Sequence, residues 1–215
     1  MVRRRITNGG RKVIGKFPSI KNGRMVWWES QLERDYLYLL EIDPEVLSYD
    51  TQPLKIEYFL DGKIHKYTPD IRVVRPNRKQ IIEVKSEEKA KKEEYVELFR
   101  TVGPICRREG YDFIVVTDKD IRIQPRLNNV KFIYKYAKTR ITNEHQILLH
   151  EIFGEKETLK LEKIIKGFPL KGMRAATVYA LIFRGILWID LSKPINPGSE
   201  VRLSLALPQI RSKAA

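Results

Sequence analysis

The chain has 215 residues, a formal net charge of +14 and 42% hydrophobic residues. This hydrophobic share is enough for packed cores, which excludes a wholly disordered chain. A single cysteine, Cys106, excludes an intrachain disulfide framework and a zinc site built on paired cysteines. No apolar run reaches the roughly 18 residues of a membrane span, and residues 1–17 lack the apolar region of a secretory signal. We therefore expect a cytoplasmic protein.

The positive charge is concentrated at the start of the chain. Residues 1–24 carry eight basic side chains and no acidic one, whereas residues 25–141 are almost balanced. Such a segment predicts a flexible basic arm whose partner is a polyanion. Nucleic acid is the favoured partner, and an acidic membrane surface is the weaker alternative. A solubilising tail is the alternative. The residues predicted to bind DNA are Arg3, Arg4, Arg5, Arg11, Lys12 and Lys16.

Hydrophobic periodicity predicts a helix over residues 27–43, stopped by Pro44, and then a series of short strands. Asp61-Gly62 between two alternating runs is a strong hairpin signal. The strands are expected over residues 46–49, 54–60, 63–67, 71–74 and 80–85.

A charged helix is expected over residues 87–109, with a possible interruption at Gly103-Pro104. The apolar run 112–117 is typical of a buried strand, and 130–134 is read as another. Helices alternating with these strands predict an α/β fold in which a mixed central sheet is flanked by helices. We assign this domain to residues 25–141.

The last part of the chain, residues 142–215, has a different pattern. Helices are expected over 142–153, 158–165 and 173–184, followed by strands in 186–190 and 200–207. Gly185 has the character of a helix stop. Helices followed by a two-stranded wing predict a small winged-helix-like C-terminal domain, and a helical extension packed on the first domain is the alternative.

Charged residues at two neighbouring strands form the candidate site. Asp70 begins one strand, and Glu83 and Lys85 project from the same face of a later strand because side chains alternate along a strand. If the two strands pair, two carboxylates and an amine converge. Two hard oxygen ligands with an open side suit Mg²⁺, which keeps several waters and binds phosphate. A surface ion pair between Glu83 and Lys85 and plain turn chemistry at Asp70 are the alternatives.

A third acid is expected from the first helix. Glu29 and Glu33 are four residues apart and share a helix face, so either could reach the metal. We favour Glu33 because it lies nearer the middle of the helix and precedes the apolar stripe. An ion pair with a neighbouring basic residue such as Arg34 is the alternative.

The order Pro69-Asp70, a short spacer, and Glu83-Val84-Lys85 resembles the motif of the PD-(D/E)xK nuclease superfamily, which has a restriction-endonuclease-like fold. The surrounding segments make the resemblance more specific, because they are similar to the TnsA endonucleases of heteromeric transposases. These segments are residues 28–35, 52–54, 67–70, 82–85 and 113–118.

This resemblance implies a metal-dependent DNA endonuclease subunit of a heteromeric transposase, which cleaves the 5′-ended strands at transposon ends for cut-and-paste transposition. It implies Glu33, Asp70, Glu83 and Lys85 as catalytic residues. Mg²⁺ would be held by Glu33, Asp70, Glu83 and the Val84 carbonyl, while Lys85 orients the attacking water. Gln52 matches a recurrent family position, and a structural role is expected for it.

The resemblance also implies the partners. They are double-stranded DNA at transposon ends, a DDE-type recombinase (TnsB-like), and an AAA+ ATPase regulator (TnsC-like) bound through the C-terminal domain. The alternatives are a free-standing restriction or repair nuclease, and a non-catalytic DNA-binding or recruitment subunit. The apolar character of the expected helix 173–184 favours protein docking over the reading of bases.

Overall fold

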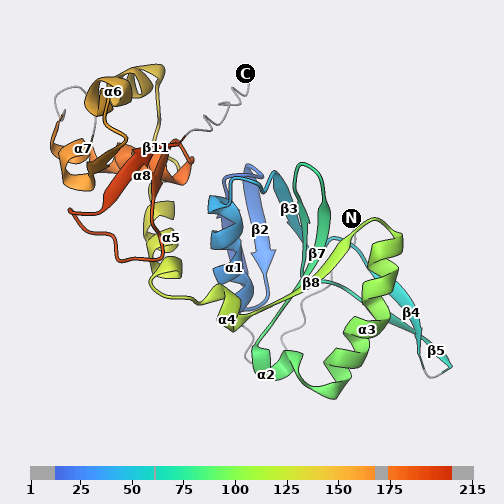
Figure 1. The fold of residues 1–215 in the computed structure, drawn as a ribbon. Coiled ribbons are helices and arrows are strands. Elements are labelled where there is room, and N and C mark those ends of the chain that lie inside the picture. The colour runs from blue at the N-terminus through green and yellow to red at the C-terminus, as the bar shows by residue number, and fades with distance from the viewer. Residues whose placement is uncertain (1–12, 61, 168–173, 205–215) are drawn as a thin grey trace. The chain divides into compact units, whose positions relative to one another are not determined.

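The computed structural model describes residues 13–60, 62–167 and 174–204. The chain forms two compact units, Met1–Ile123 and Gln124–Ala215 (Figure 1). The second unit therefore begins ahead of the predicted domain boundary after residue 141. Within the described residues, none of the helices combines the length and the apolar character that a membrane crossing requires.

A four-stranded mixed sheet forms the centre of the first unit. Its strands in spatial order are β3 (Ser48–Thr51), β6 (Ile71–Val74), β7 (Lys79–Lys85) and β8 (Asp112–Thr117). β3, β6 and β7 are antiparallel neighbours, whereas β7 and β8 run parallel. Helices flank the sheet (Figure 1), so the predicted α/β fold class is confirmed at this level.

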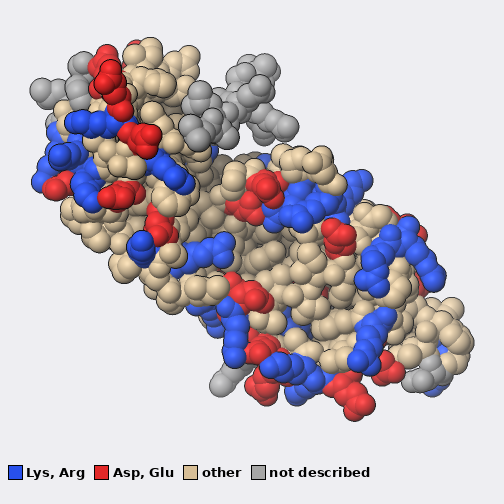
Figure 2. Space-filling model, viewed as in Figure 1, with Lys and Arg blue, Asp and Glu red and all other residues tan. Residues whose placement is uncertain are grey.

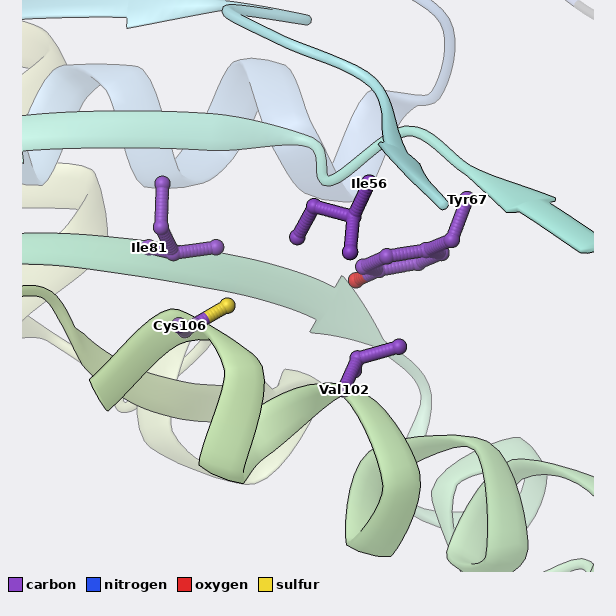
Figure 3. Close-up of a cluster of buried hydrophobic side chains, with 5 residues drawn as sticks. All are labelled: Ile56, Tyr67, Ile81, Val102 and Cys106. Atoms are coloured by element: carbon purple, nitrogen blue, oxygen red, sulfur yellow. The ribbon is translucent and has the colours of Figure 1, made fainter. Parts of the chain in front are cut away.

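Helices connect and cover these strands. Ser30 caps the first helix, because its side chain accepts a 3.1 Å hydrogen bond from the Glu33 backbone N–H. A buried cluster joins the hairpin of residues 56–67, the strand β7 and the helix of residues 93–108. Its members are Ile56, Tyr67, Ile81, Val102 and Cys106 (Figure 3). The helices of this unit are α1 (Gln31–Ile42), α2 (Glu87–Ala90), α3 (Glu93–Arg108) and α4 (Asp118–Ile121).

Residues 15–24, which belong to the segment predicted as a flexible arm, are folded, and this corrects the sequence analysis. β1 (Gly15–Ser19) and β2 (Arg24–Trp28) form an antiparallel hairpin. Phe17, Val26 and Trp28 are buried, and this alternation holds the hairpin despite the surrounding basic residues. Consequently α1 begins at Gln31 rather than at Trp27.

The long charged helix is interrupted at a different place from the one predicted. The break falls at Lys91 and Lys92, between α2 and α3, and Pro104 lies inside α3. Val102 and Cys106, on either side of the proline, are both packed into the buried cluster. This packing offsets the hydrogen bond that proline removes from the helix.

The predicted hairpin is present and leads into the sheet. β4 (Ile56–Leu60) and β5 (Lys63–Tyr67) pair antiparallel, and Gly62 adopts the positive φ of +75° that the turn requires. In Figure 1 the hairpin extends beyond the sheet. Tyr67 is buried at its base, three residues before Asp70, so the hairpin anchors the chain where the candidate site begins.

The second unit contains helices and a three-stranded antiparallel sheet with the order β10-β11-β9. Residues 130–134 are helical, so the predicted strand is wrong. Leu127, Val130 and Ile133 are buried at three-residue spacing, which is a helical period. The elements are α5 (Arg126–Tyr134), α6 (Asn143–Phe153), β9 (Thr158–Lys160), α7 (Leu161–Gly167), α8 (Ala175–Phe183), β10 (Leu187–Ile189) and β11 (Glu200–Leu203).

Two further expectations for this unit have different outcomes. The predicted helix 158–165 is wrong in its first three residues, because Leu159 is buried in β9 and lies opposite Val201 in the sheet. Gly185 ends α8 as predicted, with a φ of +69° and its N–H bonded to the Ile182 carbonyl.

Candidate active site

Asp70, Glu83 and Lys85 come together at one end of the central sheet. Ile71 lies opposite Ile82 in the β6–β7 ladder, so Asp70 arrives beside the end of β7. The Lys85 ammonium Nζ lies 2.5 Å from Glu83 Oε1 and 3.7 Å from Asp70 Oδ2. Alternation along β7 therefore brings one cation between two carboxylates.

The two carboxylates are held by different donors. Asp70 Oδ2 accepts a 2.8 Å hydrogen bond from the Val84 backbone N–H, and the Tyr67 hydroxyl donates to Glu83 Oε2. Burial, and then the negative charge of Glu83, raise the pKa of Asp70 to about 8. Asp70 thus holds a proton near neutral pH, unless further positive charge enters the site.

Lys85 keeps its charge in this setting. Burial opposes the ammonium form, but the carboxylates of Asp70 and Glu83 outweigh burial and raise the pKa of Lys85. Its Nζ also lies 5.7 Å from the ring centroid of Tyr95 on α3, at the outer limit of a cation–π contact. Lys85 is therefore a permanent cation at this end of the sheet.

Glu33 reaches the same region from the first turn of α1. Its side chain is buried, and Oε2 accepts a 2.8 Å hydrogen bond from the Glu29 backbone N–H. Burial raises the pKa of Glu33, while the positive charge of Lys85 acts in the opposite direction. The charge of Glu33 in turn contributes to the raised pKa of Asp70. The predicted helix acid is electrostatically part of the cluster.

Gln52 connects the segment just before α1 to the residue just before β6. Its backbone N–H donates a 2.8 Å hydrogen bond to the Asp70 carbonyl, and its side-chain amide donates to the Glu29 carboxylate. Glu29 lies before α1, which begins at Gln31, and its carboxylate faces Gln52, whereas Glu33 lies in the first turn of the helix.

The donor set fits a magnesium ion only in part. Considering only the described ranges, no group of three or more His, Cys, Asp and Glu side chains is arranged to hold a metal ion. Asp70 and Glu83 nevertheless form a carboxylate pair around Lys85, in which burial and then the charge of Glu83 raise the pKa of Asp70. Mg²⁺ is commonly held by one or two carboxylates together with waters and substrate phosphate, so the Asp70–Glu83 pair suits it without a third acidic ligand.

Sequence reasoning missed two contributors to the site. Tyr67 lies directly before the Thr-Pro-Asp sequence, but nothing in a strand pattern shows that its hydroxyl reaches Glu83. Glu29 is visible as an acid, but its bond to Gln52 spans two separate segments. His65 on β5 stacks on Tyr58 with ring centroids 5.3 Å apart.

Most of the predicted DNA-binding residues fall outside the part of the chain that can be placed. Arg3, Arg4, Arg5, Arg11 and Lys12 lie outside the described residues. Lys16 is exposed on β1, and its Nζ lies 4.7 Å from the ring centroid of Trp27. It is part of the hairpin and not of a free arm.

Comparison with known families relates the site to a function. Residues 43–118 match the family described as TnsA-like endonuclease N terminal. This segment includes Gln52, Tyr67, Asp70, Glu83 and Lys85, whereas Glu33 precedes it. No curated protein matches the chain. The part of the chain that carries the strand residues of the candidate site is thus similar to the N-terminal domain of TnsA-like endonucleases, which confirms the resemblance seen in the sequence.

Proposed function

We propose that this protein is a Mg²⁺-dependent DNA endonuclease subunit of a heteromeric transposase, which cuts the 5′-ended strands at transposon ends. The observation that carries the proposal is the convergence of Asp70, Glu83 and Lys85 within the segment that matches TnsA-like endonucleases. Two acids and one lysine lie side by side, an arrangement that suits metal-assisted hydrolysis of a phosphodiester.

Each residue has a distinct role in this proposal. Mg²⁺, when bound, supplies charge neutralisation for the scissile phosphate and a bound water of lowered pKa. Asp70 and Glu83 would hold it from the strands, with Glu33 from α1 and the Val84 carbonyl as further oxygen donors. Lys85 would orient the attacking water and stabilise negative charge on the phosphate in the transition state. Tyr67 would keep the Glu83 carboxylate in place.

The second unit serves as a docking domain in this proposal. Its order of helix, strand, helix, helix, strand and strand, from α6 to β11, supports a winged-helix assignment. In α8 the apolar residues are mostly buried, and the flanking Arg184 donates a 3.0 Å hydrogen bond to the Thr139 carbonyl. These features disfavour base recognition by α8, and the docking of an AAA+ ATPase regulator on this unit rests on the resemblance to TnsA-like endonucleases.

Binding of DNA by the basic start of the chain is a further part of the proposal. Figure 2 shows basic and acidic side chains interspersed on the visible face of the first unit, so the excess charge is not gathered on that face. Deleting residues 1–12 removes five basic side chains and keeps every residue of the β1–β2 hairpin. Each phosphate contact contributes about 0.9 to the log–log salt slope of binding. The deletion should flatten that slope, whereas an unchanged slope would show a solubilising tail.

The cleavage test uses DNA that carries a transposon end and a scrambled control, each labelled separately on the two strands. The full-length protein is incubated with Mg²⁺, with and without the DDE-type recombinase. We expect 5′-strand cleavage at the end only when the recombinase is present. Asp70→Asn should reduce that cleavage by roughly 10³-fold or more, because it removes a metal-binding charge.

Asp112→Asn is the matched control, since Asp112 is exposed and pairs with Gln80 at the opposite end of the ladder between β7 and β8. It should cleave as the wild type does. Sequence-selective double-strand cutting by the protein alone would instead favour a free-standing restriction-type nuclease. Full cleavage by the Asp70→Asn protein would favour a recruitment subunit and contradict the catalytic assignment.

A further inference from the structure

Gln52 has an unusual backbone. Its φ is +49°, and it is the one non-glycine residue with a positive φ among the residues that the structure describes. The left-handed region is unfavourable for a residue with a Cβ, and such conformations persist where neighbouring contacts impose them. The contacts of Gln52 should therefore show which interactions maintain this backbone conformation.

Those contacts form a continuous chain of hydrogen bonds between two candidate site residues. The Asp70 carbonyl accepts the Gln52 backbone N–H, and the Glu29 carboxylate accepts the Gln52 side-chain amide. The Glu29 backbone N–H then donates 2.8 Å to the Glu33 carboxylate. One glutamine thus joins the start of β6 to the start of α1.

We propose that Gln52 is a positioning residue that fixes Glu33 relative to Asp70 and thereby sets the affinity of the site for a divalent cation. The second part of this proposal, the effect on cation affinity, rests on the proposed function because it assumes that these acids hold Mg²⁺. The first part, the coupling of Gln52 to Glu33 through Glu29, stands on the hydrogen bonds alone.

The charge of Glu29 explains why a glutamine suits this position. The amide supplies an N–H donor to the carboxylate without adding a cation beside Glu33 and Asp70. A lysine or arginine there would pair with Glu29 but would also compete with Mg²⁺ for the nearby acids. A neutral donor orients Glu29 and leaves the electrostatics of the site to Lys85 and the metal.

The test uses three variants of the full chain. Gln52→Gly relieves the left-handed strain and keeps the N–H to Asp70, but loses the side-chain bond to Glu29. Glu29→Gln keeps an oxygen that accepts this bond. Gln31→Ala, at an exposed position on the first turn of α1, is the matched control for loss of an amide.

The metal-free measurement is hydrogen exchange of the Glu29 amide. We expect exchange to be about tenfold faster in Gln52→Gly than in Gln31→Ala, because a hydrogen bond to a charged group is lost next to it. Glu29→Gln should exchange close to the wild-type rate. Equal exchange in Gln52→Gly and Gln31→Ala would overturn the coupling.

The second measurement is Mg²⁺ affinity by isothermal titration. Gln52→Gly should bind Mg²⁺ about tenfold more weakly, whereas Gln31→Ala should stay close to the wild type. Faster exchange at Glu29 with unchanged affinity would overturn the positioning role. If the wild type itself bound no Mg²⁺, the proposed function would fail, and the exchange result would still decide the coupling separately.

Discussion

Two acidic sites in the first unit, one with a single carboxylate and one with several, are built in opposite ways. Glu41 is 2% exposed and accepts hydrogen bonds from the Ser19 and Tyr49 hydroxyls, each at 2.6 Å, and from two backbone N–H groups. At the candidate site, Asp70 and Glu83 lie around the single ammonium of Lys85. Glu41 is thus surrounded by hydrogen-bond donors, whereas Asp70 and Glu83 place two carboxylates close together.

This difference separates a structural role from a functional one. A buried carboxylate with several neutral donors stabilises the fold, and at Glu41 it joins the β1–β2 hairpin to α1 and β3. A carboxylate whose pKa is raised to about 8 beside a second acid costs folding energy. Such an arrangement is typical of sites that bind a cation or a substrate. The comparison therefore predicts that mutations at the two sites change the free energy of unfolding in opposite directions.

The largest effect on stability is expected at Glu41. Glu41→Ala leaves two hydroxyls and two backbone N–H groups without their acceptor, and each buried unpaired group costs about 1–3 kcal/mol. We expect a loss of about 3–5 kcal/mol in the free energy of unfolding, measured by urea denaturation. A loss below about 1 kcal/mol would show that Glu41 is not a structural anchor.

Asp70→Asn should shift stability in the other direction. The amide removes the like-charge repulsion with Glu83, at the cost of a weaker acceptor for the Val84 N–H. We expect a gain of about 1–3 kcal/mol at pH 8 together with the loss of cleavage. Destabilisation by a similar amount in the same urea experiment would place Asp70 with Glu41 among the structural acids.

The pH dependence of stability follows from the same shift. The folded chain keeps a proton on Asp70 up to about pH 8, whereas the unfolded chain releases it near the ordinary value of 3.8. Since the native state binds more protons between these values, its stability should fall as the pH rises from about 4 to 8. Unfolding free energies at pH 5 and pH 8 measure this fall, and Asp70→Asn should make it shallower. Parallel pH profiles for the two proteins would contradict the assigned shift.

Tyr67→Phe should have the smallest effect. The substitution keeps the ring in the buried cluster and removes only the hydroxyl that donates to Glu83. We expect a change within about 1 kcal/mol in the free energy of unfolding, because Lys85 still pairs with Glu83. Mg²⁺ affinity, measured by titration, should fall severalfold if Tyr67 orients the ligand, and an unchanged affinity would limit Tyr67 to packing.

Several strands of the first unit could be predicted from the sequence. The expected strands 63–67, 71–74 and 112–117 have the bounds of β5, β6 and β8, because alternation and apolar runs are local signals. The β1–β2 hairpin was hidden because basic residues are interspersed with the buried Phe17, Val26 and Trp28 in that segment and continue the basic run that precedes it. Residues 130–134 are too few for periodicity to distinguish a strand from a helix.

The candidate site was predictable where its residues share one strand. Glu83 and Lys85 are two residues apart on β7, so their common face follows from strand geometry. The contribution of Gln52 was not predictable, because its bonds to Glu29 and Asp70 join distant segments and depend on a positive φ. Pairings of this kind arise from tertiary structure and leave no periodic pattern.

The most direct test of the account is to locate a divalent ion in a crystal of the full chain soaked with Mn²⁺, using anomalous diffraction. Mn²⁺ accepts the carboxylate and water ligands that suit Mg²⁺ and gives a measurable anomalous signal. We predict a peak between the Asp70 and Glu83 carboxylates, with oxygen distances of roughly 2.0–2.2 Å, and its loss in Asp70→Asn. A saturated crystal with no peak at these residues, or the same peak in the Asp70→Asn protein, would contradict the account.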